Sequence, residues 1–327
     1  MHILFCSAGR RVELLKNARQ SLGGKGRIVA TDLSNSAPAL YVADAAYLVP
    51  PITSADYLDA ILQICRKERI EAIVTCIDPE IQLLARHRRE FEEIGVQVLA
   101  PEEESADICF DKYRMYCHLS ACGIPTVRTF SDLAAFERAH EAGEIAFPVF
   151  VKPRTGSGSV GAAKVESMQQ LRSAVDRDPS LIIQEYMGDA VDVDADVYVD
   201  TITRQPVSIF AKRKLATRIG GASKTISFKD PKLVDFLCNA LQHFSFCGPV
   251  DVDLFCRDGQ YYLSEINPRF GGAYLHAWGA GVDFFAMLQK NLAGIANEAD
   301  FFGYEADVAM LMYDSVVITK LEDFQNP

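Results

Sequence analysis

A lysine followed by a glycine- and serine-rich loop is the stretch of this sequence best equipped for chemistry. An apolar run ends in Lys152, and the loop 156–161 separates it from a second apolar run at 162–165. Because glycine has no Cβ, such a loop can bring its backbone N–H groups against an anion, and Lys152 would add positive charge at its base. A nucleotide phosphate is the ligand that such a loop is suited to bind, although a flexible turn has the same composition. The loop residues are Gly156, Ser157, Gly158, Ser159, Val160 and Gly161.

Two known phosphate-binding loops fit this stretch less well. The dinucleotide pattern G-x-G-x-x-G needs a helix that opens inside the glycines, whereas the next helical pattern here starts only at Met168. The P-loop pattern needs a lysine at the position of Ala162. The loop is therefore predicted to join two strands of a hairpin and to clamp phosphates from there.

A second set of residues is suited to binding a cation. Asp258-Gly259 is a two-residue hairpin signal between apolar strands predicted at 250–255 and 261–267. Acids at matching positions of such a hairpin meet on one face, about 5 Å apart. Two facing carboxylates without a cation would repel each other, and oxygen ligands suit Mg²⁺. The candidate ligands are Asp253, Glu265 and Asn267.

Two further charged runs stand out, and the first of them lies on a predicted strand. The run 192–200 alternates at period two, so Asp194 and Asp196 share one strand face; an ordinary solvated strand edge alternates in the same way. A basic cluster follows downstream. It consists of Lys212, Arg213, Lys214 and Arg218.

The elements that must position these residues begin with an alternating pattern in residues 1–104. Strands are predicted at 2–6, 27–32, 72–76 and 96–99, and helices at 12–22, 57–69 and 81–94. Such alternation makes a parallel, doubly wound sheet whose site lies at the carboxyl ends of the strands. The residues that follow those ends are Gly9 to Arg11, Asp32 and Asp78.

An NAD-dependent dehydrogenase is the obvious alternative for this part of the chain. Asp32 ends the second strand as a ribose-binding acid would, but the first turn has one glycine, Gly9, followed by Arg10 and Arg11 instead of three spaced glycines. The two arginines would suit a carboxylate or phosphate, with a solvated helix start as the structural alternative. This half of the chain alone does not make a convincing NAD site.

Composition limits the class of protein. The chain has 327 residues, 49% of them hydrophobic, which suggests two or three domains. A net charge of −11 argues against a general nucleic-acid or anionic-membrane binder. Nine cysteines without C-x-x-C spacing indicate reduced core residues. With no apolar leader or membrane span in the sequence, we expect a cytoplasmic protein.

Taken together, these pieces resemble the ATP-grasp superfamily, in the branch that contains the large subunit of carbamoyl phosphate synthetase. The resemblance covers nearly the whole chain and rests on the order and spacing of several motifs. These are Asp111-Lys112, Phe150-Val151-Lys152-Pro153, the 156–161 loop, Gln184-Glu185-Tyr186-Met187 and Ser264-Glu265-Ile266-Asn267-Pro268-Arg269. The family implies an α/β preATP-grasp domain at 1–104, an ATP-grasp N-terminal part with its lid at 105–187, and an α+β C-terminal domain with the metal ligands at 188–327.

The resemblance also implies a role for each matched residue. Lys112 and Lys152 would contact the phosphates of ATP beneath the 156–161 loop, and Asp192 would bind the ribose hydroxyls. A hinge would recognise adenine, largely through backbone groups; its residues are Gln184, Glu185, Tyr186 and Met187.

The matched metal ligands would hold one or two Mg²⁺ ions, with Mn²⁺ as an alternative ion. They are Asp253, Glu265 and Asn267, although the family often has Gln or Glu at the first of these. Arg269 would face the transferred phosphate. Arg213 and Arg218 lie where the family has cations that face the substrate.

The implied reaction activates a carboxylate with ATP as an acyl phosphate, which an amine then attacks to give ADP, phosphate and an amide. Lys152, Arg269 and Mg²⁺ would offset the repulsion between two anions, and a glycine-hinged lid would exclude water. We expect an amino acid or small peptide as substrate. Selectivity is expected from Gly9 to Arg11, Asp78, Arg213 to Arg218 and Gly271 to His276.

Two other functions stay open: a single-module carboxylate or small-molecule kinase, and a non-catalytic ATP-binding protein. Carbamoyl phosphate synthetase uses two such ATP modules plus further domains, and this sequence shows one, so complete carbamoyl phosphate synthesis is not expected. Family members are often dimers, and a homodimer is one open assembly.

Overall fold

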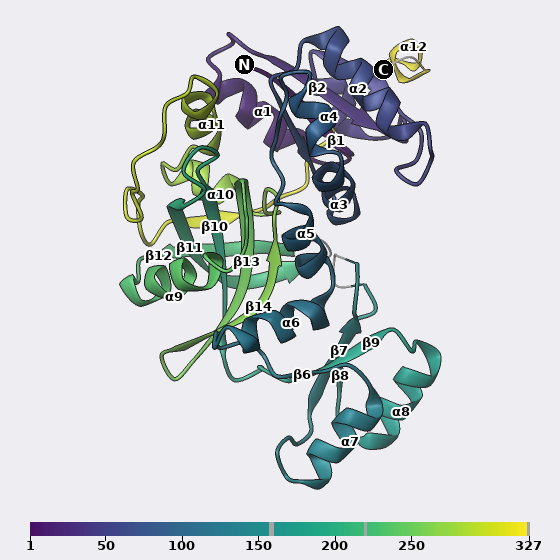
Figure 1. Ribbon diagram of the computed structural model, residues 1–327, viewed down its shortest axis with the longest axis vertical. Helices are drawn as coiled ribbons and strands as arrows, with labels where there is room; N and C mark the ends of the chain where they lie inside the picture. Colours follow the sequence, from purple (N-terminus) through teal and green to yellow (C-terminus); the bar gives the residue numbers. More distant parts are fainter. Residues whose placement is uncertain (157–159, 219–220, 326–327) are drawn as a thin grey trace.

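Three β-sheets, one parallel and two antiparallel, organise the part of the chain that the structure describes (Figure 1). The computed structural model describes residues 1–156, 160–218 and 221–325. In Figure 1 the parallel sheet lies at the top, the six-stranded antiparallel sheet in the middle and the four-stranded sheet at the bottom. This architecture confirms the predicted α/β class with a parallel N-terminal sheet.

The N-terminal sheet is parallel throughout and has the strand order β3-β2-β1-β4-β5. Its strands are β1 (His2–Cys6), β2 (Arg27–Asp32), β3 (Ala45–Leu48), β4 (Ala72–Thr75) and β5 (Gln97–Val98). Its helices are α1 (Val12–Ser21), the 3₁₀ helix η1 (Pro38–Val42), α2 (Tyr57–Glu68), α3 (Asp78–Arg86) and α4 (Arg88–Glu92). Ile3 and Phe5 pack in one hydrophobic cluster with α1, whereas Leu4 packs in another with α2 and α3. Both faces are therefore covered, as in a doubly wound sheet.

One predicted element of this sheet is wrong. The helix expected over 81–94 is two helices, because His87 leaves helical geometry with φ −100° and ψ 18°. The edge strand β3 was not predicted; its side chains are only partly buried, so its apolar run is short and weak as a pattern.

The four-stranded sheet is antiparallel, with the order β6-β9-β7-β8. It contains β6 (Thr129–Phe130), β7 (Val149–Pro153), β8 (Ala163–Val165) and β9 (Leu181–Glu185), with helices α7 (Leu133–Glu141) and α8 (Met168–Arg177). β7 pairs with β8 from Val149↔Val165 to Val151↔Ala163, so the glycine-rich loop does join two strands of a hairpin. Ser157, Gly158 and Ser159 of that loop lie outside the described residues.

The six-stranded sheet is also antiparallel and has the order β14-β13-β10-β11-β12-β15. Its strands are β10 (Val191–Val199), β11 (Pro206–Arg218), β12 (Gly221–Phe228), β13 (Gly248–Arg257), β14 (Gln260–Asn267) and β15 (Ala309–Leu311). The predicted Asp258-Gly259 turn is present, and both residues have positive φ, 53° and 76°.

The helices of this half are α5 (Glu103–Phe110), α6 (Lys112–Ala121), α9 (Pro231–Leu241), α10 (Leu275–Gly279), α11 (Phe284–Leu292) and α12 (Leu321–Gln325). Of these, α5, α10, α11 and α12 were not predicted, and neither were β12 and β15. Within the described residues, no helix combines the length and the apolar character that a membrane span requires.

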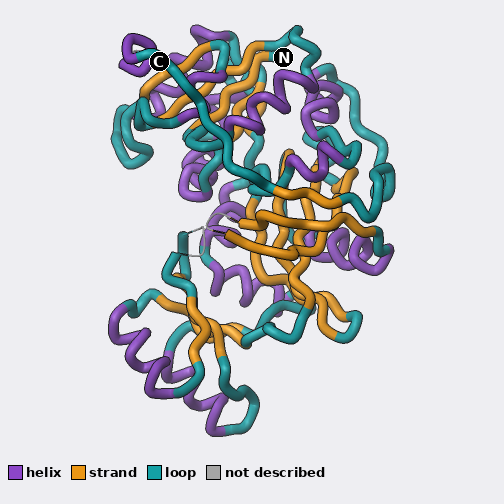
Figure 2. The backbone as a smooth tube through the Cα atoms, turned by 180° about the vertical axis from the view of Figure 1, so that it is seen from behind, coloured by secondary structure: helices purple, strands orange, loops and turns teal. Residues whose placement is uncertain are grey.

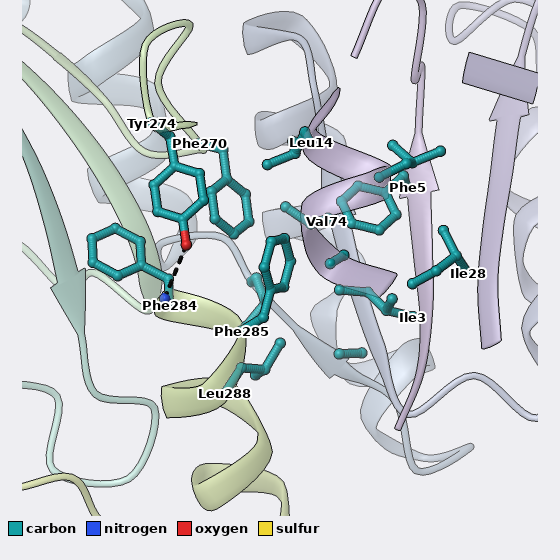
Figure 3. Close-up of a cluster of buried hydrophobic side chains, with 14 of the residues drawn as sticks. Ile3, Phe5, Leu14, Ile28, Val74, Phe270, Tyr274, Phe284, Phe285 and Leu288 are labelled. Atoms are coloured by element: carbon teal, nitrogen blue, oxygen red, sulfur yellow. Dashed lines mark hydrogen bonds between the residues drawn. The ribbon is translucent and has the colours of Figure 1, made fainter. Parts of the chain in front are cut away.

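A shared core of aromatic side chains joins the N-terminal sheet to the segment that follows β14 (Figure 3). Phe285 of α11 lies between Phe5 of β1 and Phe270, at ring-centroid distances of 6.1 and 4.9 Å. The Tyr274 hydroxyl accepts a hydrogen bond from the Phe284 backbone N–H at 3.0 Å. This core holds the loop after β1 against residues 270–274, which brings two of the predicted substrate regions together.

Candidate active site

One face of the six-stranded sheet carries a ladder of acidic side chains, which we call the acid ladder. Its members face each other through the strand register, because alternate residues of a strand point to the same face. Asp194 lies opposite Asp253, which lies opposite Glu265 on β14. In the next row Asp196 lies opposite Asp251, which lies opposite Asn267. The structure therefore brings Asp253, Glu265 and Asn267 together, as the hairpin predicted.

Two lysines from outside this sheet converge on Glu265. Lys112, at the start of α6, has its Nζ 3.8 Å from Oε1 of Glu265, and Lys152 of β7 has its Nζ 3.3 Å from Oε2. The Lys112 ammonium also donates to the backbone carbonyl of Gly156 at 2.6 Å. The two predicted phosphate-binding lysines, the described start of the glycine-rich loop and a predicted metal ligand thus meet at one point.

The position of Lys112 follows from the local sequence. Asp111 caps α6, because its Oδ1 accepts the backbone N–H groups of Tyr113 and Arg114 at 3.0 Å each. The same carboxylate pairs with Arg154 at the end of β7, with 2.6 Å between Nη2 and Oδ2. The backbone N–H of Lys112 donates to the Arg154 carbonyl at 3.0 Å. The cap therefore fixes α6 and β7 to each other and places both lysines on one side.

Burial lowers the pKa of Lys112, and the Lys152 charge acts in the same direction, while Glu265 opposes both. Two ammonium groups so close together repel each other unless an anion lies between them. Glu265 fills that role here, and the phosphates of a nucleotide carry the charge to do the same.

Arg269 links the acid ladder to the N-terminal sheet. Its Nε donates to Oδ1 of Asp78 at 2.8 Å, and its Nη1 donates to Oδ2 of Asp251 at 3.2 Å. Burial alone would lower the pKa of this guanidinium, but Asp78 and Asp251 raise it above its ordinary value. Asp78 begins α3 at the carboxyl end of β4, the edge where a parallel sheet presents its site.

Two lysines of β11 neutralise the rest of the ladder. Lys212 is fully buried and pairs with Asp196 and, at 3.1 Å, with Asp194. Lys214 pairs with Asp253 and, at 3.0 Å, with Asp192. Burial would raise the pKa of Asp253, but Lys214 outweighs it and the pKa falls. The sequence marked these lysines only as part of a basic cluster; their spacing of two, matched to that of the acids, was the available signal.

Two sets of oxygen ligands could hold a metal ion, and they differ in what already fills them. Carboxylate oxygens of Asp194, Asp196 and Asp251 lie within 4.8 Å of one another, but these residues are buried and the Lys212 ammonium pairs with the first two. The side chains of Asp253 and Glu265 are more accessible, at 29% and 20%, and Asn267 lies beside them, its Nδ2 3.3 Å from Asp253 Oδ2. The donor set of Asp253, Glu265 and Asn267 therefore fits a hard cation such as Mg²⁺.

Other predicted residues take different positions. Arg213 lies between two inward-facing lysines and so points to the opposite face of β11, where its guanidinium covers the Phe228 ring at 4.7 Å. Arg218 ends β11 and pairs with Asp314 at 3.1 Å. The structure brings neither arginine to the acid ladder, because period-two alternation separates Arg213 from its neighbours and distance along the strand separates Arg218.

The predicted adenine hinge consists of the last two residues of β9 and the two residues that follow it. The side chain of Gln184 donates to Thr129 Oγ1 at 2.8 Å, and Glu185 pairs with Arg257 at 2.6 Å. Met187 is buried, with 5% of its surface exposed. With these side chains engaged in packing and pairing, recognition of a base at this segment would depend on its backbone groups.

The sequence matches two family models. Residues 109–273 match the model described as the ATP-grasp domain, and residues 3–99 match the one described as the PylC-like, N-terminal domain. The carbamoyl phosphate synthase arginine-specific large chain of Geobacillus stearothermophilus is 27% identical over 240 residues. That match covers 70% of this chain but only 22% of the relative's length.

Solved structures share the fold. N5-carboxyaminoimidazole synthetase from Staphylococcus aureus, complexed with ADP, has a TM-score of 0.74 and 18% identity, covering 91% of this chain and 78% of that one. L-amino acid ligase from Bacillus licheniformis has a TM-score of 0.67 and 15% identity, covering 91% of this chain and 75% of that one. At these identities the similarity concerns the arrangement of the elements.

The close packing at Gly271 leads to a prediction about stability. A Cβ at this position would lie 2.6 Å from Oδ1 of Asp196 and 2.6 Å from Oδ1 of Asp251. We expect Gly271→Ala to lower the free energy of unfolding by about 1–3 kcal/mol, because the buried charges must shift. Urea denaturation measures the change. The control is Gly279→Ala at the end of α10, where no heavy atom lies within 4 Å of the added Cβ; equal losses in both variants would contradict this account.

The buried His276 predicts a dependence of stability on pH. Its Nε2 must donate to the Val308 carbonyl (3.0 Å), so its Nδ1 accepts from the Thr225 hydroxyl (2.7 Å), and the ring is neutral. Burial, with the nearby Lys212 charge, lowers the pKa of His276 to about 4. In the unfolded chain the histidine has a pKa of about 6.5. Between these two pKa values the unfolded chain therefore binds a proton more readily than the folded protein does.

Acidification from about pH 6.5 to about pH 4 should therefore destabilise the protein through His276, by up to about 1.4 kcal/mol per pH unit. Above about pH 6.5 His276 is neutral in both the folded and the unfolded state, so its contribution to the free energy of unfolding is fully present there. We expect His276→Gln to show a shallower fall in unfolding free energy over this window, since contributions from the carboxylates are common to both proteins. Urea denaturation at a series of pH values gives the two slopes, and equal slopes would refute the assignment.

Proposed function

The chain belongs to the ATP-grasp family, and from this premise we propose that it is an ADP-forming ligase that joins a carboxylate to an amine. The observation that carries the proposal is the convergence of Lys112 and Lys152 on Glu265, beside Asp253 and Asn267. This cluster offers cations for phosphates and oxygen ligands for a metal ion within one small region. The activities of two structural neighbours, a carboxyaminoimidazole synthetase and an amino acid ligase, support a synthetic reaction.

In this proposal ATP lies between the four-stranded and six-stranded sheets. Lys112 and Lys152 bind its phosphates, which take the place of Glu265 as their partner. Asp192, which reaches the edge of the acid ladder, binds the ribose hydroxyls once it is released from Lys214. The backbone of 184–187 binds adenine, and the 156–161 loop covers the phosphates.

Asp253, Glu265 and Asn267 would hold one or two Mg²⁺ ions, with Mn²⁺ as an alternative. A bound ion would neutralise phosphate charge and polarise the transferred phosphoryl group. Both carboxylates have lysine partners in the structure, so these lysines become free to face the anionic substrates when the carboxylates turn to a cation.

The chemistry needs no side-chain nucleophile. An oxygen of the substrate carboxylate attacks the γ-phosphorus of ATP, the bond to the β-phosphate oxygen breaks, and ADP leaves. The amine nitrogen then attacks the acyl carbon, phosphate departs, and the nitrogen loses a proton to give the amide. Lys152 and Arg269 offset the repulsion between carboxylate and phosphate, and Asp78 and Asp251 hold Arg269 in place.

The deciding experiment measures ADP release with Mg²⁺ and ATP across amino acids, singly and in pairs, with mass detection of the products. ADP release that requires a pair of substrates, together with the mass of an amide, would support the ligase. ADP release with one acid alone would favour the single-module kinase. ATP binding without turnover across the panel would favour a non-catalytic role.

The paired lysine and carboxylate give a prediction about turnover. We expect Lys152→Ala and Glu265→Gln each to lower ADP release at least about a hundredfold, because the first removes a cation that faces the phosphates and the second removes a carboxylate ligand of the metal ion. Circular dichroism would check that the fold is retained. Lys290→Ala, a change at an exposed lysine of α11, is the matched control. Near-normal turnover in either site variant would remove the basis of the site assignment.

A further inference from the structure

A pocket lies beside the acid ladder, on the side of the N-terminal sheet. Its volume is about 400 Å³, within the range of pockets that bind small molecules. It is lined by the start of α1, by β12 and by residues 271–275. The segment 312–317, which we call the strap, forms another wall.

The strap connects the six-stranded sheet to the N-terminal sheet. Figure 2 shows it as part of a loop that leaves the central sheet and ends in a short helix beside the N-terminal part. That helix, α12, is attached through the Phe324 ring, which stacks on Tyr41 at 6.4 Å, and through the Phe324 carbonyl, which accepts from Asn35 at 3.1 Å. The strap therefore spans the pocket between two attached ends.

The charges of the pocket favour an anion. Three arginines and two carboxylates line it, and Arg218 pairs with Asp314 while Glu13 pairs with Lys16. This leaves Arg10 without an ion pair in the described part of the chain. Among the residues that the structure describes, the Arg11 guanidinium donates to two backbone carbonyls: its Nη1 to Gly271 at 2.9 Å and its Nη2 to Phe270 at 3.3 Å.

The remaining walls are largely apolar. Side chains from five separate segments contribute: Val12, Leu14, Pro38, Ala222, Tyr274, Leu275, Met312 and Val316. Val316 belongs to this lining and is 81% exposed. A ligand with an apolar body would cover this surface, and burial of that surface would stabilise the complex.

The pocket adjoins the proposed site of phosphoryl transfer. Gly271 lies in its wall, and a Cβ on this glycine would lie 2.6 Å from the Asp251 carboxylate, which itself pairs with Arg269. The backbone carbonyls that hold Arg11 belong to the two residues that follow Arg269. A ligand in the pocket would therefore lie next to residues 270–271, which connect it to Arg269.

We propose that this pocket binds a small carboxylic acid with an apolar body, such as an apolar amino acid or dipeptide, and that the strap closes over it. The inference rests on the proposed ligase function for the fate of the acid. Arg10 and Arg11 attract its anionic end, and the strap and the start of α1 enclose its apolar part. The pocket thus determines which acids reach Arg269.

The test measures binding to the full chain by calorimetry, in the presence of saturating Mg²⁺ and ADP so that the nucleotide site is filled. The probes are leucine, phenylalanine, alanyl-leucine, the C-terminal amide of each, and inorganic phosphate. We expect at least one acid to bind, and its amide to bind at least about tenfold more weakly, because the amide lacks the charge that the arginines meet. Absence of binding by all three acids, equal affinity of acid and amide, or phosphate binding as tightly as the acids would overturn the proposal.

Two pairs of variants at exposed positions separate the pocket from general surface charge. Arg10→Gln removes a pocket cation, and Lys25→Gln removes an exposed cation just after α1 and outside the lining. Val316→Asp places a carboxylate in the pocket wall, and Ile318→Asp, at a side chain that is 91% exposed, places one on the same segment outside the lining. We expect the first member of each pair to weaken acid binding at least about fivefold and the second to leave it unchanged. Equal effects within a pair would overturn the proposal.

The same variants distinguish failure of the pocket from failure of the function. If no amide forms with any substrate pair but the acids bind and the variants act as expected, the ligase proposal fails and the pocket stands. If an amide forms but Arg10→Gln and Val316→Asp leave the KM for the acid unchanged, the function stands and the pocket fails.

Discussion

The structure depends on the neutralisation of the crowded carboxylates of the acid ladder. Six acids project from β10, β13 and β14 onto the same face, and like charges in a partly buried environment repel strongly. Their partners come from four different places: Lys112 begins α6, Lys152 ends β7, Lys212 and Lys214 lie on β11, and Arg269 follows β14. Electrostatics therefore ties together segments that local folding would leave independent, and the place where they meet is the candidate site.

The buried end and the partly exposed end of the acid ladder have different roles. Lys212, with no exposed surface, pairs with Asp194 and Asp196, so that end of the acid ladder is part of the buried interior of the sheet. Glu265 and Asp253 are partly exposed and their partners reach them from flexible side chains. The same residue types thus serve the fold at one end and are available for substrates at the other.

Period-two and strand–helix patterns explain why much of the fold could be predicted. Each pattern records which side of an element is buried, so the parallel sheet and the β13–β14 hairpin were foreseen from local sequence alone. β12 was missed because its buried face carries Thr225 and Ser227, whose hydroxyls are satisfied by His276 and by the backbone carbonyls of Glu305 and Val308, far away in sequence. The contact of Lys112 and Lys152 with Glu265 likewise could not be predicted from the sequence, because it depends on how the sheets are placed relative to one another.

The four-stranded sheet has a hydrophobic cluster made only of residues between Phe130 and Ile183, with its own helices α7 and α8 packed on it. Its ties to the rest of the site include the ionic pairs of Lys152 with Glu265 and of Glu185 with Arg257. Separating such pairs exposes charge but little apolar surface, so the heat-capacity change of moving this unit away would be small. The balance between its near and far positions would then vary little with temperature, and dissolved salt would act on it mainly through the more exposed pair of Glu185 with Arg257.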